Sequence, residues 1–256
     1  MINYITVFIF GTIVGSFLNV CIYRLPLGKS IVWPGSFCPR CKHPIKWFDN
    51  IPLVSFLVLR GKCRHCADPI SIRYIIVELV TALSAVAFLA RFGVGYSFFA
   101  YELLLCALIV IVFIDIDRQE IPDVISLPGI FAGVALMTVL RLDGSGVYAK
   151  SFANSVLGVL AGGGSMFLMG VIGGMVFRKE ALGGGDVKLM AMIGAFLGWE
   201  LVLLTFFMAP VLGSVGGLIV KIKFKKDIIA YGPYLSIAAA ISLLYGRDIL
   251  RYLFLL

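Results

Sequence analysis

The chain has 256 residues, of which 61% are hydrophobic and only 14% are charged. Soluble domains carry about 45–50% apolar and about 25% charged residues, so this composition excludes both a water-soluble globular domain and a disordered chain. The net charge of +8 does not indicate nucleic-acid binding, because the basic residues cluster in loops beside long apolar blocks. The sequence therefore predicts an all-α polytopic protein embedded in a lipid bilayer.

The first apolar block covers residues 5–23. No basic residue precedes it and no small-residue cleavage site follows it, which favours a retained transmembrane helix over a secretory signal. Gly11 and Gly15 form a GxxxG pattern within this block. Such a pattern is typical of helices that pack closely, and we expect a neighbouring helix to lie against these glycines.

Residues 24–73 form a basic segment that contains four of the six cysteines, both histidines and nine Lys or Arg residues. We expect a small cytoplasmic domain here, between the first and second transmembrane helices. Its cysteines form two CxxC pairs: Cys38, Cys41, Cys63 and Cys66. Two such pairs suit a structural Zn²⁺ ion in a closed, zinc-ribbon-like site, whereas two disulfides are the weaker alternative in a reducing compartment. Metal binding would also stabilise a domain with so small a core.

Residues 74–256 are predicted to form the remaining membrane-embedded domain. The 32-residue apolar run 189–220 is divided at Gly198, Trp199 and Glu200 into a short helix and a second helix, although its exact span boundaries are not determined by the sequence. About eight transmembrane helices follow from this division. With residues 24–73 in the cytoplasm, 17 of the 22 Lys and Arg residues fall on the cytoplasmic side, as the positive-inside rule requires.

Acidic residues at the ends of two predicted spans are candidates for function, because acids are costly in a membrane. Asp115, Asp117 and Asp123 occur in the sequence FIDIDRQEIPD, and Asp186 occurs in LGGGDVKL. The predicted topology places Asp115 and Asp186 at the same depth on the cytoplasmic side. Two such carboxylates can share a proton, so that one activates water while the other polarises a peptide carbonyl.

Other acids near the membrane leave alternatives open. Asp117 and Asp123 can support the pair of carboxylates or can simply end helices in the headgroup region. Glu78, just inside the second span, can orient the site, pair with Arg73 or serve a structural role. The glycines beside Asp186, among them Gly183 and Gly185, allow a close approach of backbone to a neighbouring chain or a substrate.

Several motifs together resemble those of the prepilin peptidases, the leader peptidases of type IV pili and type II secretion. They appear in the family's order over about residues 11–220: GSFLNVCIYRLP, the paired CxxC motifs, NIPLVSFLVLRGKC, PISIRYIIVELVTA, FIDIDRQEIPD and the GxGD block EALGGGDVKL. The block alone would be a weak signal, whereas the combination is very specific.

The resemblance implies a multi-pass aspartic protease of the GxGD class in the bacterial inner membrane, which cleaves prepilins and pseudopilins at the cytoplasmic face. It places the two catalytic residues at Asp115, rather than Asp117, and Asp186. The four paired cysteines match the family's zinc ligands. Many members also N-methylate the new N-terminus with S-adenosylmethionine, and the presence of the full N-terminal region implies this activity here, although no residue can be assigned to that cofactor.

Two interpretations from other functional classes compete with this one. The first is a non-enzymatic zinc-ribbon scaffold of a secretion or pilus assembly, which gives no reason for an Asp among glycines at the depth of Asp115. The second is a proton-coupled transporter that uses the acids as a relay. Transporters usually contain internal repeats with interrupted helices, and we find no repeat in this chain.

Overall fold

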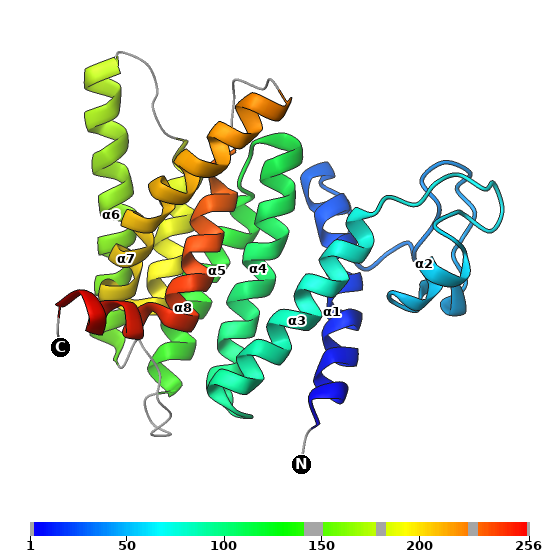
Figure 1. Cartoon of the computed structure of the whole chain (residues 1–256), viewed down its shortest axis with the longest axis horizontal. Coiled ribbons are helices and arrows are strands. Elements are labelled where there is room, and N and C mark those ends of the chain that lie inside the picture. Colours follow the sequence, from blue (N-terminus) through cyan, green and yellow to red (C-terminus); the bar gives the residue numbers. More distant parts are fainter. Residues whose placement is uncertain (1–2, 141–150, 178–182, 225–229, 255–256) are drawn as a thin grey trace. The chain divides into compact units, whose positions relative to one another are not determined.

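The computed structural model describes residues 3–140, 151–177, 183–224 and 230–254 (Figure 1). Within these ranges the chain is helical and forms no strand beyond two isolated bridges, which confirms the predicted all-α architecture. In chain order the helices are α1 (Tyr4–Arg24), η1 (Leu25–Leu27), η2 (Trp47–Asn50), α2 (Val54–Val58), α3 (Arg73–Phe92), α4 (Tyr96–Arg118), α5 (Asp123–Leu140), α6 (Phe152–Phe177), α7 (Gly184–Phe224) and α8 (Gly232–Phe254).

The chain divides into two compact units, unit 1 (Met1–Val94) and unit 2 (Gly95–Leu256). Unit 1 thus joins the first helix, the cysteine segment and α3, whereas the functional division predicted from the sequence, at residues 23 and 73, stays a prediction. Some of the basic residues that were counted for the orientation lie outside the described residues: Arg141, Lys150, Arg178, Lys179, Lys225 and Lys226.

In unit 1, α1 packs against α3 through the two glycines of the GxxxG pattern. A Cβ atom on Gly11 would lie 2.7 Å from the Cα of Ala82, and one on Gly15 would lie 2.6 Å from the Cα of Glu78. Both distances are shorter than real carbon contacts allow, so only glycine permits this approach. Asn19 of α1 adds a hydrogen bond, because its side-chain amide donates to the Tyr74 carbonyl at 3.1 Å. The predicted close packing is confirmed.

The cysteine segment is tied to the end of α1 by a buried arginine. Arg24 is the last residue of α1 and is only 6% exposed. Its guanidinium donates to the carbonyls of Ser30 and Gly35, both at 3.0 Å. A planar guanidinium with several donors can hold two chain segments at once, so the segment leaves the helix on a defined path.

In unit 2, α7 is two helices that meet at Gly198. This residue has φ of 80° and ψ of 176°, a backbone conformation that only glycine adopts readily. The Asn154 side chain, near the start of α6, accepts a hydrogen bond from the Trp199 N–H at 3.4 Å. In Figure 1 the chain reverses here, from the yellow part of α7 to its gold and orange part. The predicted division at this glycine is confirmed, and each of the eight predicted spans corresponds to a helical segment of the described chain.

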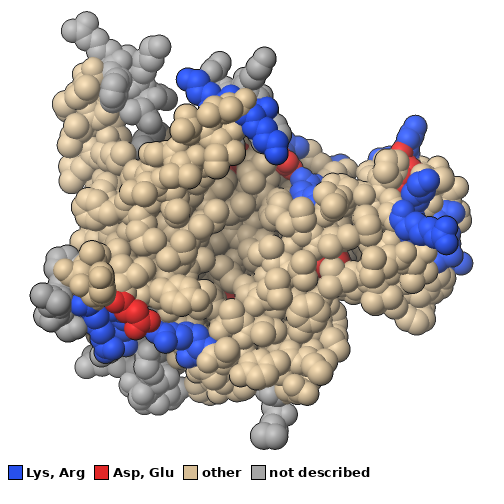
Figure 2. Space-filling model, viewed as in Figure 1, with Lys and Arg blue, Asp and Glu red and all other residues tan. Residues whose placement is uncertain are grey.

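Among the residues that the structure describes, five helices are long and apolar enough to cross a membrane, namely α1, α3, α4, α6 and α7, and α5 is a shorter apolar helix. The second part of α7 exposes an apolar stripe at helical spacing, formed by Phe207, Val211, Val215 and Leu218, all at least 60% exposed. Over unit 2 in Figure 2, charged side chains gather where α7 and α8 end, and the surface between them carries almost none. This distribution suits a lipid-facing surface.

Candidate functional site

The ends of four helices converge in unit 2 and bring together the acids that the sequence singled out. They are the C-terminal end of α4 and the N-terminal ends of α5, α7 and α8, and the described chain shows packing between α4 and each of the other three. Asp115 lies in the last turn of α4 and Asp186 in the first turn of α7. Asp115 and Asp186 are 71 positions apart in the sequence. They lie at the same end of the packed helices only because α4 and α7 pack against each other.

Asp115 is buried, with 5% of its surface exposed. Its Oδ2 atom accepts a hydrogen bond from the backbone N–H of Gly232, at the start of α8, at 2.9 Å. A Cβ atom on Gly232 would lie 2.6 Å from this same oxygen, so the close approach depends on glycine. One oxygen of the carboxylate is thus turned toward α8.

Asp186 stands beside this buried acid and is close enough for the Asp115 charge to act on it. Its position follows from the glycines before it. A Cβ atom on Gly185 would lie 2.9 Å from the Cβ of Ile121, in the α4–α5 connection, so α7 begins in direct contact with that connection. The Asp186 N–H donates to the Gly183 carbonyl at 3.1 Å, which fixes the first turn. The two carboxylates therefore lie within electrostatic range of each other.

Tyr231 lies next to this pair, directly before α8. Burial raises the pKa of its hydroxyl to about 12, and the negative charge of Asp186 contributes to this rise. The tyrosine therefore stays protonated over the whole physiological range. Its hydroxyl is available as a hydrogen-bond donor near Asp186.

The other acids of the motif have different surroundings. Asp117 is exposed, two residues after the buried Asp115. Asp123 begins α5 and forms an ion pair with Lys188 of α7 at 2.7 Å, with both side chains more than a third exposed. Exposed ion pairs contribute about 0–1 kcal/mol, so this one orients α5 and α7 more than it stabilises them. The supporting roles predicted for Asp117 and Asp123 stay predictions.

Gly232 and Tyr231 are site residues that the sequence reasoning missed. They occur in the sequence YGPY, directly before the last apolar run. A Gly-Pro pair at the beginning of a helix is a recognisable start signal, but nothing in the sequence connects it with an acid more than a hundred residues earlier. Only the packing of α8 beside α4 reveals the connection.

In unit 1 the four paired cysteines form one cluster, as the sequence predicts. Their sulfur atoms all lie within 4.8 Å of one another, and the Cys38 and Cys66 sulfurs are 3.9 Å apart. Tetrahedral zinc with Zn–S bonds near 2.3 Å requires a separation of about 3.8 Å between sulfurs. The donor set and spacing therefore fit a closed four-thiolate zinc site.

The two halves of this cluster have the same backbone conformation. The N–H of Cys38 donates to the His43 carbonyl at 3.0 Å, and the N–H of Cys63 donates to the Asp68 carbonyl at 2.8 Å. The residues after the second cysteines, Lys42 and Ala67, both have positive φ, 59° and 57°. The sequences CPRCKHPI and CRHCADPI are thus two copies of one metal-binding turn, a repeat that the sequence reasoning did not identify.

Backbone groups of the second turn prepare a thiol for metal binding. The N–H groups of Cys66 and His65 point at the Cys63 sulfur and lower the pKa of that thiol to about 7. Metal ligands must be thiolates, and of the two thiols in this turn Cys63 is the more readily ionised, since burial and the neighbouring sulfurs raise the pKa of Cys66 to about 12. The two turns are further joined by an ion pair between Arg40 and Asp68.

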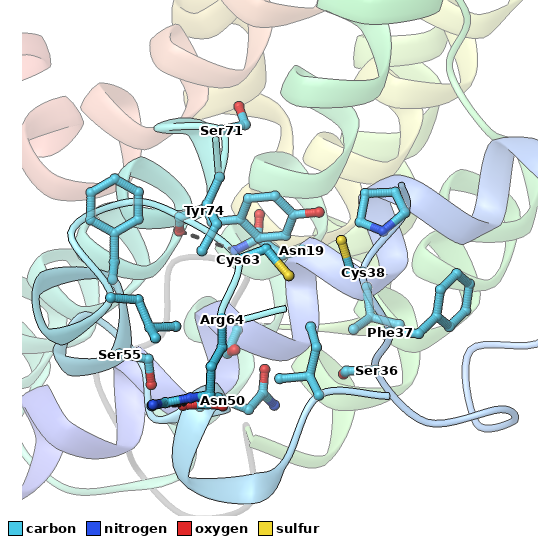
Figure 3. Close-up of a pocket in the computed structure, with 18 of the residues that line it drawn as sticks. Asn19, Ser36, Phe37, Cys38, Asn50, Ser55, Cys63, Arg64, Ser71 and Tyr74 are labelled. Carbon is cyan, nitrogen blue, oxygen red and sulfur yellow. Dashed lines mark hydrogen bonds and ion pairs between the residues drawn. The ribbon is translucent and has the colours of Figure 1, made fainter. Parts of the chain in front are cut away.

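A cavity of about 410 Å³ opens in unit 1 among α1, α3 and the cysteine segment. Figure 3 shows Asn19, Tyr74 and the sulfurs of Cys38 and Cys63 on its wall. Glu78 also lines it, and this buried carboxylate accepts the Leu53 N–H at 2.8 Å. The residue thus belongs to unit 1 and holds the cysteine segment. Its predicted support of the catalytic carboxylates stays a prediction.

Comparisons with known proteins follow the same division of the chain. The model of the Bacterial Peptidase A24 N-terminal domain matches residues 9–92, and that of the Type IV leader peptidase family matches residues 102–218. The first match lies within unit 1 and contains the cysteine cluster. The second lies within unit 2 and contains both Asp115 and Asp186. No solved structure matches the chain.

Curated relatives cover most of the chain, and three of them share the name "Prepilin leader peptidase/N-methyltransferase". That of Aeromonas hydrophila is 36% identical over 96% of this chain and 92% of its own length. That of Pseudomonas aeruginosa is 37% identical over 94% of this chain and 90% of its own length. That of Myxococcus xanthus is 44% identical over 83% of this chain, which spans only 61% of the relative's length.

Proposed function

Because the chain belongs to the type IV leader peptidase family, we propose that it cleaves the leader peptides of type IV prepilins and type II secretion pseudopilins. We further propose that it methylates the new N-terminal amine of the product. It is a multi-pass protein of the bacterial inner membrane. The observation that carries the proposal is the meeting of two acids, Asp115 and Asp186, at the ends of two apolar helices.

The chemistry of cleavage follows from a shared proton between these carboxylates. Two buried carboxylates that act on each other do not readily both ionise, so one would be a base and the other an acid. The ionised one takes a proton from water as the water oxygen attacks the peptide carbonyl, and the protonated one donates to the carbonyl oxygen. Collapse of the intermediate breaks the C–N bond, and the proton taken from water passes to the leaving amine. One water is consumed, giving a leader carboxylic acid and a free amine.

The orientation of the site is part of the proposal. Basic residues lie close to it, among them Arg118 at the end of α4 and Lys188 in α7, and the positive-inside rule places such loops in the cytoplasm. A substrate whose apolar helix lies in the bilayer would then present its leader junction at the cytoplasmic end of α4 and α7. Basic side chains at this end would attract an acidic group of the substrate.

The experiment that tests the proposal uses purified wild type, Asp115→Asn and Asp186→Asn with a prepilin in detergent. Intact-mass spectrometry follows the product with and without S-adenosylmethionine. We expect the wild type to remove the leader and, with the methyl donor, to add the mass of one methyl group. Neither variant should cleave, because an amide cannot exchange the shared proton. Normal cleavage by either variant would contradict this assignment.

Zinc is proposed as a structural ion held by Cys38, Cys41, Cys63 and Cys66. The four-thiolate set leaves no open position for water, so the ion would stabilise the fold of the cysteine segment and take no part in cleavage. The similarity of the two metal-binding turns supports this proposal. Metal analysis of the purified protein should find one zinc per chain.

Unit 1 is proposed as the place of methyl transfer, because the peptidase family model and both catalytic acids fall in unit 2. S-adenosylmethionine would supply the methyl group: the new N-terminal amine would take it as the S–CH3 bond of the sulfonium breaks, leaving a neutral thioether, and the amine would release a proton. The unit 1 cavity has a volume within the usual range for small-molecule sites, about 300–1,000 Å³. The buried Glu78 carboxylate suits a cationic ligand, and the rings of Tyr23, Phe37 and Tyr74 offer faces for a flat base or a cation.

A non-enzymatic scaffold and a proton-coupled transporter are not favoured. Neither accounts for relatives named as peptidases that match over about nine-tenths of their length.

A further inference from the structure

The start of α8 is built so that one backbone donor is left for Asp115. The first N–H groups of any helix have no carbonyl partner within the helix. Here the N–H groups of Tyr234 and Leu235 both donate to the Tyr231 carbonyl, at 3.0 and 3.2 Å. Pro233 has no N–H to donate. The Gly232 N–H therefore points away from its own helix, and it donates to Asp115 at 2.9 Å.

Two constraints meet at Gly232. A Cβ atom there would lie 2.6 Å from Oδ2 and 3.3 Å from Cγ of Asp115, so any other residue would push the carboxylate away. The residue before a proline is also restricted, because the proline ring clashes with its Cβ. Glycine removes both clashes, and the backbone of α8 can lie directly against the acid.

This contact fixes which oxygen of Asp115 is free for chemistry. Oδ2 accepts the Gly232 N–H, so a lone pair of this oxygen is directed toward α8. The contact also lies at a helix N-terminus, where the helix dipole is positive, and in a buried place where hydrogen bonds hold their geometry strongly. The remaining oxygen, Oδ1, is then the one that can face water and the proton shared with Asp186.

We propose that Gly232 is a positioning residue for leader cleavage, because its N–H locks the Asp115 carboxylate in the orientation that leaves Oδ1 for the reaction. This inference rests on the proposed peptidase function. It assigns to α8, outside the residues matched by the peptidase family model (102–218), a part in assembling the site. Gly232 itself touches the catalytic acid and not the substrate.

The test compares Gly232→Ala with Gly164→Ala in the full-length protein. Gly164 lies in α6, and a Cβ atom there would meet nothing within 4 Å, so it is the matched control. A misplacement of about 1 Å in a catalytic group costs about 100-fold in rate. We expect Gly232→Ala to lower kcat for cleavage by about 100-fold with KM nearly unchanged, while Gly164→Ala cleaves like the wild type. Methyl transfer to a pre-cleaved pilin should be unchanged in both variants.

A second measurement tests the contact without relying on activity. The Gly232→Ala substitution is made in the wild type and in Asp115→Ala, and the melting temperatures are compared. We expect Gly232→Ala to lower the melting temperature more when the Asp115 carboxylate is present than in Asp115→Ala, because the clash with that group adds to the restriction before Pro233. An equal loss in both backgrounds, or a Gly232→Ala protein that cleaves at the wild-type rate, would overturn the inference. A wild type that cleaves no prepilin would instead contradict the proposed function, and the melting comparison would still decide the contact.

Discussion

Two aspartates of the same motif illustrate how burial, rather than residue type, separates roles. Asp115 and Asp117 are two residues apart on α4, so they point to different sides of the helix. Asp115 is 5% exposed and accepts a backbone N–H from α8, whereas Asp117 is exposed. Asp115 is therefore the residue that we propose as the partner of Asp186, and the family motif implies the same assignment.

Replacing Asp117 should therefore have a small effect. We expect Asp117→Asn to lower kcat for prepilin cleavage at most severalfold, since an exposed carboxylate on another side of α4 is not needed for the shared proton. Initial rates of leader removal at saturating substrate measure this. A loss as complete as that of Asp115→Asn would assign the catalytic role to Asp117 instead.

At the scale of elements, glycines decide how closely helices of unit 2 pack. A Cβ atom on Gly158 of α6 would lie 2.1 Å from the backbone oxygen of Gly194, and a Cβ atom on Gly194 would lie 2.0 Å from the oxygen of Gly158. The two backbones thus touch, in the manner of membrane helices that pack through small residues. This contact sets the position of the first part of α7, which carries Asp186.

Adding one methyl group at this contact should separate the two helices. We expect Gly158→Ala to destabilise the protein by about 1–3 kcal/mol, the usual cost of overpacking, and to lower both the melting temperature and the cleavage rate. Differential scanning fluorimetry in detergent measures the first effect. Gly164→Ala, on the same helix and facing open space, is the control, and equal melting of the two variants would contradict the close contact.

For the molecule as a whole, two units hold the two proposed activities. Both acids proposed as catalytic and the start of α8 belong to unit 2, whereas the cysteine cluster and the cavity with Glu78 belong to unit 1. The two family models divide the chain near the same place, between residues 92 and 102. Substitutions in one unit should therefore affect one activity much more than the other.

We expect Glu78→Gln to weaken the binding of labelled S-adenosylmethionine by about tenfold or more, because it removes the buried negative charge, and to leave leader cleavage within a few-fold of the wild type. Equilibrium dialysis measures binding without any turnover. Glu200→Gln, an exposed acid at the turn of α7, serves as the control. Unchanged binding in the Glu78 variant would place the methyl donor elsewhere.

The sequence by itself determined the class of the fold and the cysteine cluster, and it pointed to the two acids that we propose as catalytic. Hydropathy, charge placement and CxxC spacing are local properties. Each depends only on residues that lie close together in the sequence. The break of α7 at Gly198 could be predicted for the same reason. The tertiary structure alone decided that α8 contacts Asp115 through Gly232, that Tyr231 lies beside Asp186 and that Glu78 lines a cavity in unit 1. These facts depend on which helices pack together. Apolar helices in a membrane pack where small residues let their backbones come close, and the hydropathy of a sequence does not show which helices will do so.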